Sequence, residues 1–120
     1  MRYYSKDHEW IEVNGETGKV GITDHAQAQL GELVFCEMEP PGTVLAAGDM
    51  AGAVESVKAA ADILTPVSGE ITAVNDALAD DPVPLNTAPE ENWLFTIRLS
   101  AAEELDALMD EGAYKVFCHE

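Results

Sequence analysis

Hydrophobic side chains recur mostly at every second position of this chain, which predicts a protein built mainly from β-strands. The clearest alternation runs through residues 93–99, where one face would carry Trp93, Phe95, Ile97 and Leu99 and the other Leu94, Thr96 and Arg98. Shorter β-rich runs are separated by Gly, Pro and Asn turn signals, at residues 9–13, 19–22, 33–39, 43–45, 50–57, 63–67 and 70–74. We therefore expect a small β-sandwich or flattened barrel.

A short helix is expected between two of these strands. Thr23 and Asp24 are residue types that start helices, and Gln27 follows Asp24 by three positions, as in a capping box. Gly31 is typical of a helix end. The sequence therefore predicts a capped helix of about two turns, inserted between strands.

The C-terminal segment, about residues 101–118, is expected to be helical. Ser100 and Glu103 have the spacing of a capping box. Leu105, Leu108 and Met109 follow at helical spacing on one face, and Gly112 is expected to end this helix.

Residues 75–89 are rich in Asp, Asn and Pro. Pro82, Pro84 and Pro89 cannot donate ladder hydrogen bonds, so the segment is expected to form a long surface loop.

Length and charge limit the classes of function. A chain of 120 residues fits a single domain, residues 1–120, and its apolar runs are shorter than the ~18 residues of a membrane span. The formal net charge of -17 opposes binding to nucleic acid or anionic lipid and favours cationic partner surfaces. Solubility, or adaptation to high salt, explains the same acidity equally well.

Cysteine and histidine give no sign of a metal site. Only Cys36 and Cys118 are present, which with the absence of a charged-then-apolar leader suggests a reducing interior. His8, His25 and His119 are scattered, and apart from the neighbours Cys118 and His119 no metal-ligand spacing occurs. We expect no metal ligands.

Lys58 stands out among the four lysines. It lies between two apolar strands, within a hairpin predicted at about residues 54–64, and its neighbours are small. An exposed primary amine on a protruding turn is what an acyl-transferring enzyme needs in order to modify a lysine. On these residues alone, an ordinary solvated lysine remains the more frequent outcome.

The segments around this lysine resemble a known family. Residues 55–59 (ESVKA) and 66–70 (PVSGE) are similar to the lipoylation site of the H protein of the glycine cleavage system. Further segments resemble that family in the same order, at residues 6–10, 21–27, 30–32 and 93–95. Biotin carriers usually flank their lysine with Met, and 2-oxoacid dehydrogenase lipoyl domains usually place Asp before it, whereas Val57 and Ala59 flank Lys58 here.

The resemblance implies a fold and a role. The fold is a mainly β, lipoyl/biotinyl-type sandwich (barrel-sandwich hybrid) with a short internal helix and a C-terminal helix. The role is that of a non-catalytic carrier with lipoate attached covalently to Lys58. Its implied partners are the PLP-dependent glycine decarboxylase (P protein), the tetrahydrofolate-dependent aminomethyltransferase (T protein) and dihydrolipoyl dehydrogenase (L protein), besides a lipoate ligase or a lipoyl/octanoyl transferase.

The resemblance also implies roles for residues near Lys58. Glu9 and Asp62 are expected to lie near the cationic aminomethyl group that the arm carries. Modifying enzymes are expected to recognise the hairpin through Glu55, Ser56, Val57 and Ala59. Alternatively, Glu9 is an ordinary strand-edge carboxylate and Asp62 keeps the hairpin soluble. His8 and His25 are expected to make structural hydrogen bonds.

Two other functions remain open on the sequence. The same modified lysine would also serve a lipoyl donor that relays its group to 2-oxoacid dehydrogenase complexes, and an unmodified interaction module would not need the lysine at all. We expect a bacterial cytoplasmic location, or the mitochondrial matrix for a mature eukaryotic chain.

Overall fold

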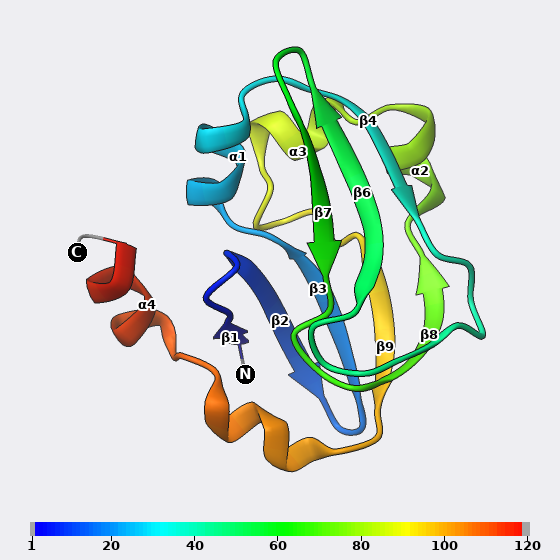
Figure 1. The fold of residues 1–120 in the computed structure, drawn as a ribbon, viewed down its shortest axis with the longest axis vertical. Coiled ribbons are helices and arrows are strands. Elements are labelled where there is room, and N and C mark those ends of the chain that lie inside the picture. Colours follow the sequence, from blue (N-terminus) through cyan, green and yellow to red (C-terminus); the bar gives the residue numbers. More distant parts are fainter. Residues whose placement is uncertain (1, 119–120) are drawn as a thin grey trace.

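The structure is a computed structural model, and it describes residues 2–118. Its strands form two antiparallel sheets (Figure 1). The larger sheet has the order β1 (Arg2–Tyr4), β2 (Glu9–Asn14), β3 (Thr17–Ile22), β9 (Phe95–Leu99), β8 (Gly69–Val74) and β5 (Val44–Leu45). The smaller sheet has the order β4 (Leu33–Met38), β6 (Met50–Ser56) and β7 (Ala60–Leu64). The mainly β sandwich expected from the alternating pattern is confirmed.

The core lies between the two sheets. Both sheets contribute side chains that are nearly inaccessible to solvent, including Ile11, Val20, Ile71, Phe95 and Ile97 from the larger sheet and Leu33, Cys36, Val54 and Ile63 from the smaller one. The shortest dimension of the molecule is 21 Å, as expected for two sheets about 10 Å apart with side chains on their outer faces. Cys36 packs as a small hydrophobic residue, and burial raises the pKa of its thiol to about 11.

The best-patterned strand of the sequence is central in the larger sheet. β9 lies between β3 and β8, and Phe95 and Ile97 are completely buried. Gly69 faces Leu99 at the start of β8, where a Cβ atom would collide with the carbonyl oxygen of Arg98. The first position of β8 therefore requires a glycine.

The internal helix is confirmed as α1 (Asp24–Leu30). Its N-cap is Thr23, whose hydroxyl accepts a hydrogen bond from the backbone N–H of Ala26 at 3.2 Å. Gly31 ends the helix with a φ of 84°, a left-handed conformation that glycine adopts without strain.

The expected long loop at residues 75–89 is wrong. This segment contains two short helices, α2 (Asp76–Asp80) and α3 (Val83–Thr87), and each buries one leucine in the core, Leu78 and Leu85. The prolines do not prevent helix formation, because Pro82 precedes α3 and Pro84 lies in its first turn, where a missing N–H breaks no hydrogen bond.

The C-terminal segment is helical but not as one capped helix. It consists of a 3₁₀ helix, η1 (Ala102–Ala107), followed by α4 (Glu111–Cys118). No side chain caps η1, so the predicted capping box of Ser100 and Glu103 is wrong. Gly112 lies in the first turn of α4 rather than at a helix end. The side chain of Asp110 caps α4 instead, by accepting a hydrogen bond from the backbone N–H of Ala113 at 2.8 Å.

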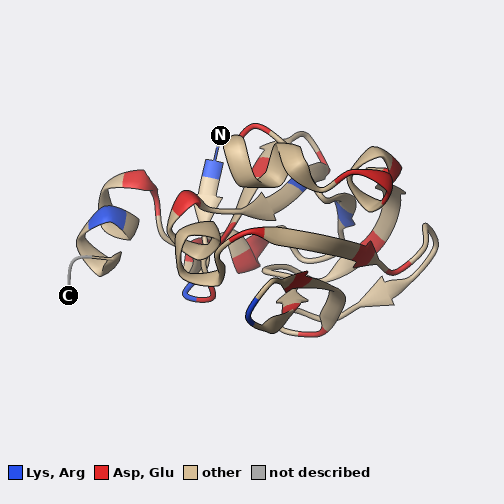
Figure 2. Ribbon diagram, turned by 90° about the horizontal axis from the view of Figure 1, so that it is seen from above, with Lys and Arg blue, Asp and Glu red and all other residues tan. Residues whose placement is uncertain are grey.

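Acidic residues lie on most elements of the fold (Figure 2). Four ion pairs join residues 2–118, and each uses one of three cations, Arg2, Arg98 or Lys115. Within the same residues, no helix combines the length and the apolar character that crossing a membrane requires.

Candidate functional site

Lys58 lies in the turn that joins β6 to β7. The two strands pair antiparallel up to Glu55 and Ala60, and the three residues between Ser56 and Ala60 form the tip. In Figure 1 this hairpin extends beyond both sheets at the top of the molecule. The side chain of Lys58 is exposed, and none of the ion pairs within residues 2–118 involves it. Its amine is therefore open to an approaching enzyme.

The Ser56 side chain organises this tip. Its hydroxyl oxygen accepts hydrogen bonds from the backbone N–H groups of Lys58 and Ala59, at 3.3 and 3.0 Å, and donates one to the Ala59 carbonyl at 3.1 Å. The backbone N–H of Ser56 donates to the same carbonyl at 2.7 Å. These bonds hold Lys58 at a fixed position on the turn.

The tip is also fastened to the end of α1. The backbone N–H of Val57 donates to the Glu32 carbonyl at 3.0 Å. A Cβ atom at Gly31 would lie 3.4 Å from Cε of Lys58, so the aliphatic stem of the lysine passes beside this glycine. The Val57 side chain is 69% exposed, which places an apolar surface next to the amine.

A cleft lies further along β7, beside α1. Its volume is about 140 Å³, and its lining includes Asp7, His8, Glu9, Leu30, Asp62 and Ile63. The structure thus brings Glu9 and Asp62 into one cleft although they are distant in sequence. Glu55 is exposed on the hairpin and is not among the residues that line this cleft.

Glu9 is buried, not an exposed strand-edge carboxylate. Its carboxyl oxygens accept hydrogen bonds from the Ser5 hydroxyl at 3.0 Å and from the backbone N–H of Leu64 at 3.1 Å. Burial raises the pKa of Glu9 to about 8, against the opposing effect of these two bonds, and the nearby Asp7 raises the pKa further. At neutral pH most of the Glu9 carboxyl is therefore protonated.

Asp62 differs from Glu9 in its environment. Its side chain is exposed on β7, where the residue is paired with Ala53 of β6. The cleft therefore has one buried acid, Glu9, and two exposed acids, Asp7 and Asp62, and α1 adds the apolar side chains of Ala26 and Leu30.

Sequence reasoning missed part of this cleft. Asp7 and His8 belong to it together with Glu9, and their position next to Glu9 in the sequence was the available signal. The contributions of Ala26 and Leu30 had no such signal, because they depend on how α1 packs against β7.

The expectation that the histidines and cysteines are scattered is wrong for three of them. His8, His25 and Cys118 lie together at one edge of the molecule. His8 also makes the structural hydrogen bond expected of it, between its Nδ1 and the Tyr114 hydroxyl at 2.8 Å. His119 lies outside the described residues.

Comparison with known proteins identifies the family. The family model described as "Glycine cleavage H-protein" matches residues 2–120. The chain belongs to this family. A glycine cleavage system H protein of Beijerinckia indica is 55% identical over 115 residues, which are 95% of this chain and 93% of that relative. A putative mitochondrial H protein of Schizosaccharomyces pombe is 45% identical over 120 residues, 99% of this chain and 71% of that relative.

A solved structure agrees with this family assignment. The crystal structure of a glycine cleavage system H protein from Mycobacterium marinum superposes with a TM-score of 0.87, at 36% sequence identity, and covers 96% of this chain and 94% of the other. The resemblance found in the motifs around Lys58 is thus confirmed over nearly the whole chain.

Proposed function

We propose that this chain is the lipoyl carrier of the glycine cleavage system, with lipoate joined to Lys58 through an amide. The exposed Lys58 amine on its hydrogen-bonded tip is the observation that carries the proposal, together with membership of the H-protein family. The chain takes the aminomethyl group of glycine from the P protein to the T protein and is then reoxidised by the L protein. The chain itself catalyses no step.

The residues around Lys58 fit a lipoyl group. When bound, the group supplies a disulfide whose sulfur atoms take up and release the one-carbon unit. Ser56 presents the amine, and amide formation removes a charge that has no ion-pair partner among the described residues. The cleft beside α1 offers apolar side chains such as Leu30 and Ile63 to the arm.

Glu9 and Asp62 are proposed to receive the cationic end of the loaded arm. A cation docked in the cleft favours the ionised form of Glu9 and so lowers its pKa from about 8, which releases a proton at neutral pH. Asp62 is exposed and contributes only ~0–1 kcal/mol to such docking. Glu9 therefore binds the cation as a carboxylate only once it has released its proton, and the cleft shields the arm from water.

Intact mass analysis of protein produced with lipoate tests the attachment site. One lipoyl group is expected on the natural chain and on Lys19→Arg, which removes another lysine, and none on Lys58→Arg. Glycine decarboxylation assayed with P protein should follow the modification. An unmodified Lys58 in a host with working lipoylation enzymes, or a lipoyl group on another lysine, would refute the proposal.

Recognition of the hairpin by a lipoate ligase or a lipoyl/octanoyl transferase is proposed to involve Glu55, Ser56, Val57 and Ala59. These residues flank Lys58 at the tip, and the side chains of Glu55 and Val57 are exposed. The family assignment does not favour the alternatives, a lipoyl relay or an unmodified interaction module.

A further inference from the structure

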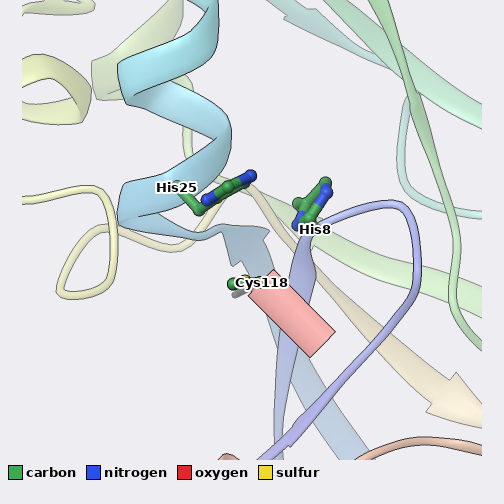
Figure 3. Close-up of side chains that lie close together, drawn as sticks. All are labelled: His8, His25 and Cys118. Carbon is green, nitrogen blue, oxygen red and sulfur yellow. The ribbon is translucent and has the colours of Figure 1, made fainter. Parts of the chain in front are cut away.

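Three metal-ligating side chains meet away from the hairpin tip. His8 lies in the turn before β2, His25 in the first turn of α1, and Cys118 is the last residue of α4 (Figure 3). One ligand atom from each residue lies within 4.8 Å of the other two. All three side chains are half-buried, so the cluster is accessible to an ion in solution.

The spacing is close to that of a zinc site. With Zn–N bonds of about 2.0–2.1 Å and a Zn–S bond of about 2.3 Å, tetrahedral geometry places ligand atoms about 3.3–3.6 Å apart. Side-chain rotations that shorten the longest separation by roughly 1 Å would complete the geometry. Two imidazoles and a thiolate leave the fourth position to water, as in open zinc sites.

The surrounding residues hold the cluster in place. The His8 ring is oriented by the Tyr114 hydroxyl, at 2.8 Å from Nδ1, and lies beside His25 with ring centroids 4.4 Å apart and the ring planes tilted by 31°. Tyr114 is buried, and its hydroxyl also lies 2.7 Å from that of Thr23, the residue that caps α1. Hydrogen bonds of this kind, which fix the rings of ligating histidines, are a regular feature of metal sites.

We propose that His8, His25 and Cys118 bind a thiophilic divalent cation, with Zn²⁺ as the representative ion. Bound there, the ion joins α4, near the C-terminus, to α1 and to the turn before β2. Imidazole and thiolate ligands select such ions over Mg²⁺ and Ca²⁺, which prefer oxygen. The net charge of -17 raises the local concentration of any cation without selecting among them.

Calorimetric titration with Zn²⁺ tests the site, using the full chain with Lys58→Arg so that no attached dithiol competes for the metal. One ion per chain is expected, and excess Mg²⁺ should not displace it. Cys118→Ser and His25→Ala should each weaken binding about tenfold or more, since loss of a ligand costs at least as much as loss of a supporting residue. These two variants are preferred to changes at His8, whose φ of 65° and contact with Tyr114 make it part of the fold.

Two matched controls make the test specific. Cys36→Ala removes the other thiol, which is buried in the core, and His119→Ala removes the neighbouring imidazole. Both should bind Zn²⁺ as the parent does, and Co²⁺ should show a sulfur-to-cobalt absorption band that only Cys118→Ser abolishes. Absence of stoichiometric binding, unchanged affinity in Cys118→Ser, or a loss in His119→Ala equal to that in His25→Ala would overturn the proposal.

Discussion

Single side chains determine how Lys58 is presented. Ser56→Ala removes the hydroxyl that binds the backbone of Lys58 and Ala59, so the tip is expected to loosen and attachment of lipoate to slow several-fold. The free energy of unfolding should fall by only about 1 kcal/mol, because the lost hydrogen bonds are near solvent. Intact mass measured over time gives the rate of attachment, with Ser56→Thr as the control that keeps a hydroxyl. Attachment to Ser56→Ala at the natural rate would contradict this role.

Glu9 makes stability depend on pH. Its pKa rises from an ordinary value of 4.5 to about 8 on folding, so between these values the folded chain binds more protons than the unfolded one. The stabilisation is complete below about pH 4.5 and is lost as the pH rises towards 8. Glu9→Gln keeps a group able to hydrogen-bond Ser5 and Leu64, but this group does not titrate. The change in the free energy of unfolding with pH should therefore be smaller in this variant by a few kcal/mol.

Urea unfolding at pH 5 and pH 8 measures the effect as a difference between variants. The natural chain should lose more stability over this interval than Glu9→Gln does, and Asp62→Asn, a change at an exposed carboxylate, should behave like the natural chain. If the free energy of unfolding depends on pH equally in the natural chain and in Glu9→Gln, folding does not raise the pKa of Glu9.

Among the elements, α2 and α3 separate what the sequence could predict from what it could not. Strands such as β9 were predictable because strict alternation of side chains is local information. In residues 75–89 the Asp and Pro content predicted a loop. The helices there are held by the burial of Leu78 and Leu85, which depends on contact with strands far away in the sequence. The splitting of the C-terminal helix at Asp110 was also missed. Ser100 and Glu103 matched a local capping pattern that the fold does not use.

Leu85→Ala tests the buried role of α3. Removal of a completely buried leucine should cost about 2–5 kcal/mol in the free energy of unfolding, whereas a loop residue would cost little. Val83→Ala is the matched control, because Val83 lies on the same helix and is 57% exposed. Denaturant unfolding of the two variants compares them directly, and equal losses would support the surface loop instead.

The site followed the same division. The position of Lys58 on a hairpin was predictable from neighbouring residues, and the closeness of Glu9 and Asp62 in one cleft from the resemblance, while their docking role stays a prediction. Burial of Glu9, and the meeting of His8, His25 and Cys118, depend on packing between elements and had no local signal.

At the scale of the whole molecule, charge is the dominant feature. Acidic residues outnumber basic ones by 23 to 6, and the ion pairs within residues 2–118 neutralise few of them. Self-repulsion of this kind lowers the stability of a folded chain, and salt screens it. The melting temperature is therefore expected to rise between about 0.05 M and about 1 M NaCl, where the Debye length falls to about 3 Å.

Thermal unfolding across this range of salt measures the effect. A melting temperature that falls with NaCl would mean that attractive pairs such as Arg2 with Glu12 outweigh the repulsion.

If Lys58 carries the proposed lipoyl arm, the strand β7 sets the distance between the attachment point and the cleft. Lys58 lies two residues before Ala60, the first residue of β7. Asp62 lies in the middle of the strand, and the backbone N–H of Leu64 at its end donates a hydrogen bond to Glu9. At about 3.3 Å per residue, Asp62 lies roughly 7 Å along the strand from Ala60, and the turn that holds Lys58 lies beyond Ala60. Adding one residue to each of the paired strands β6 and β7 would move the attachment point about 3.3 Å further from the cleft, while the length of the arm stays the same. We therefore expect that lengthening this hairpin weakens docking of the arm even when every residue of the cleft is kept.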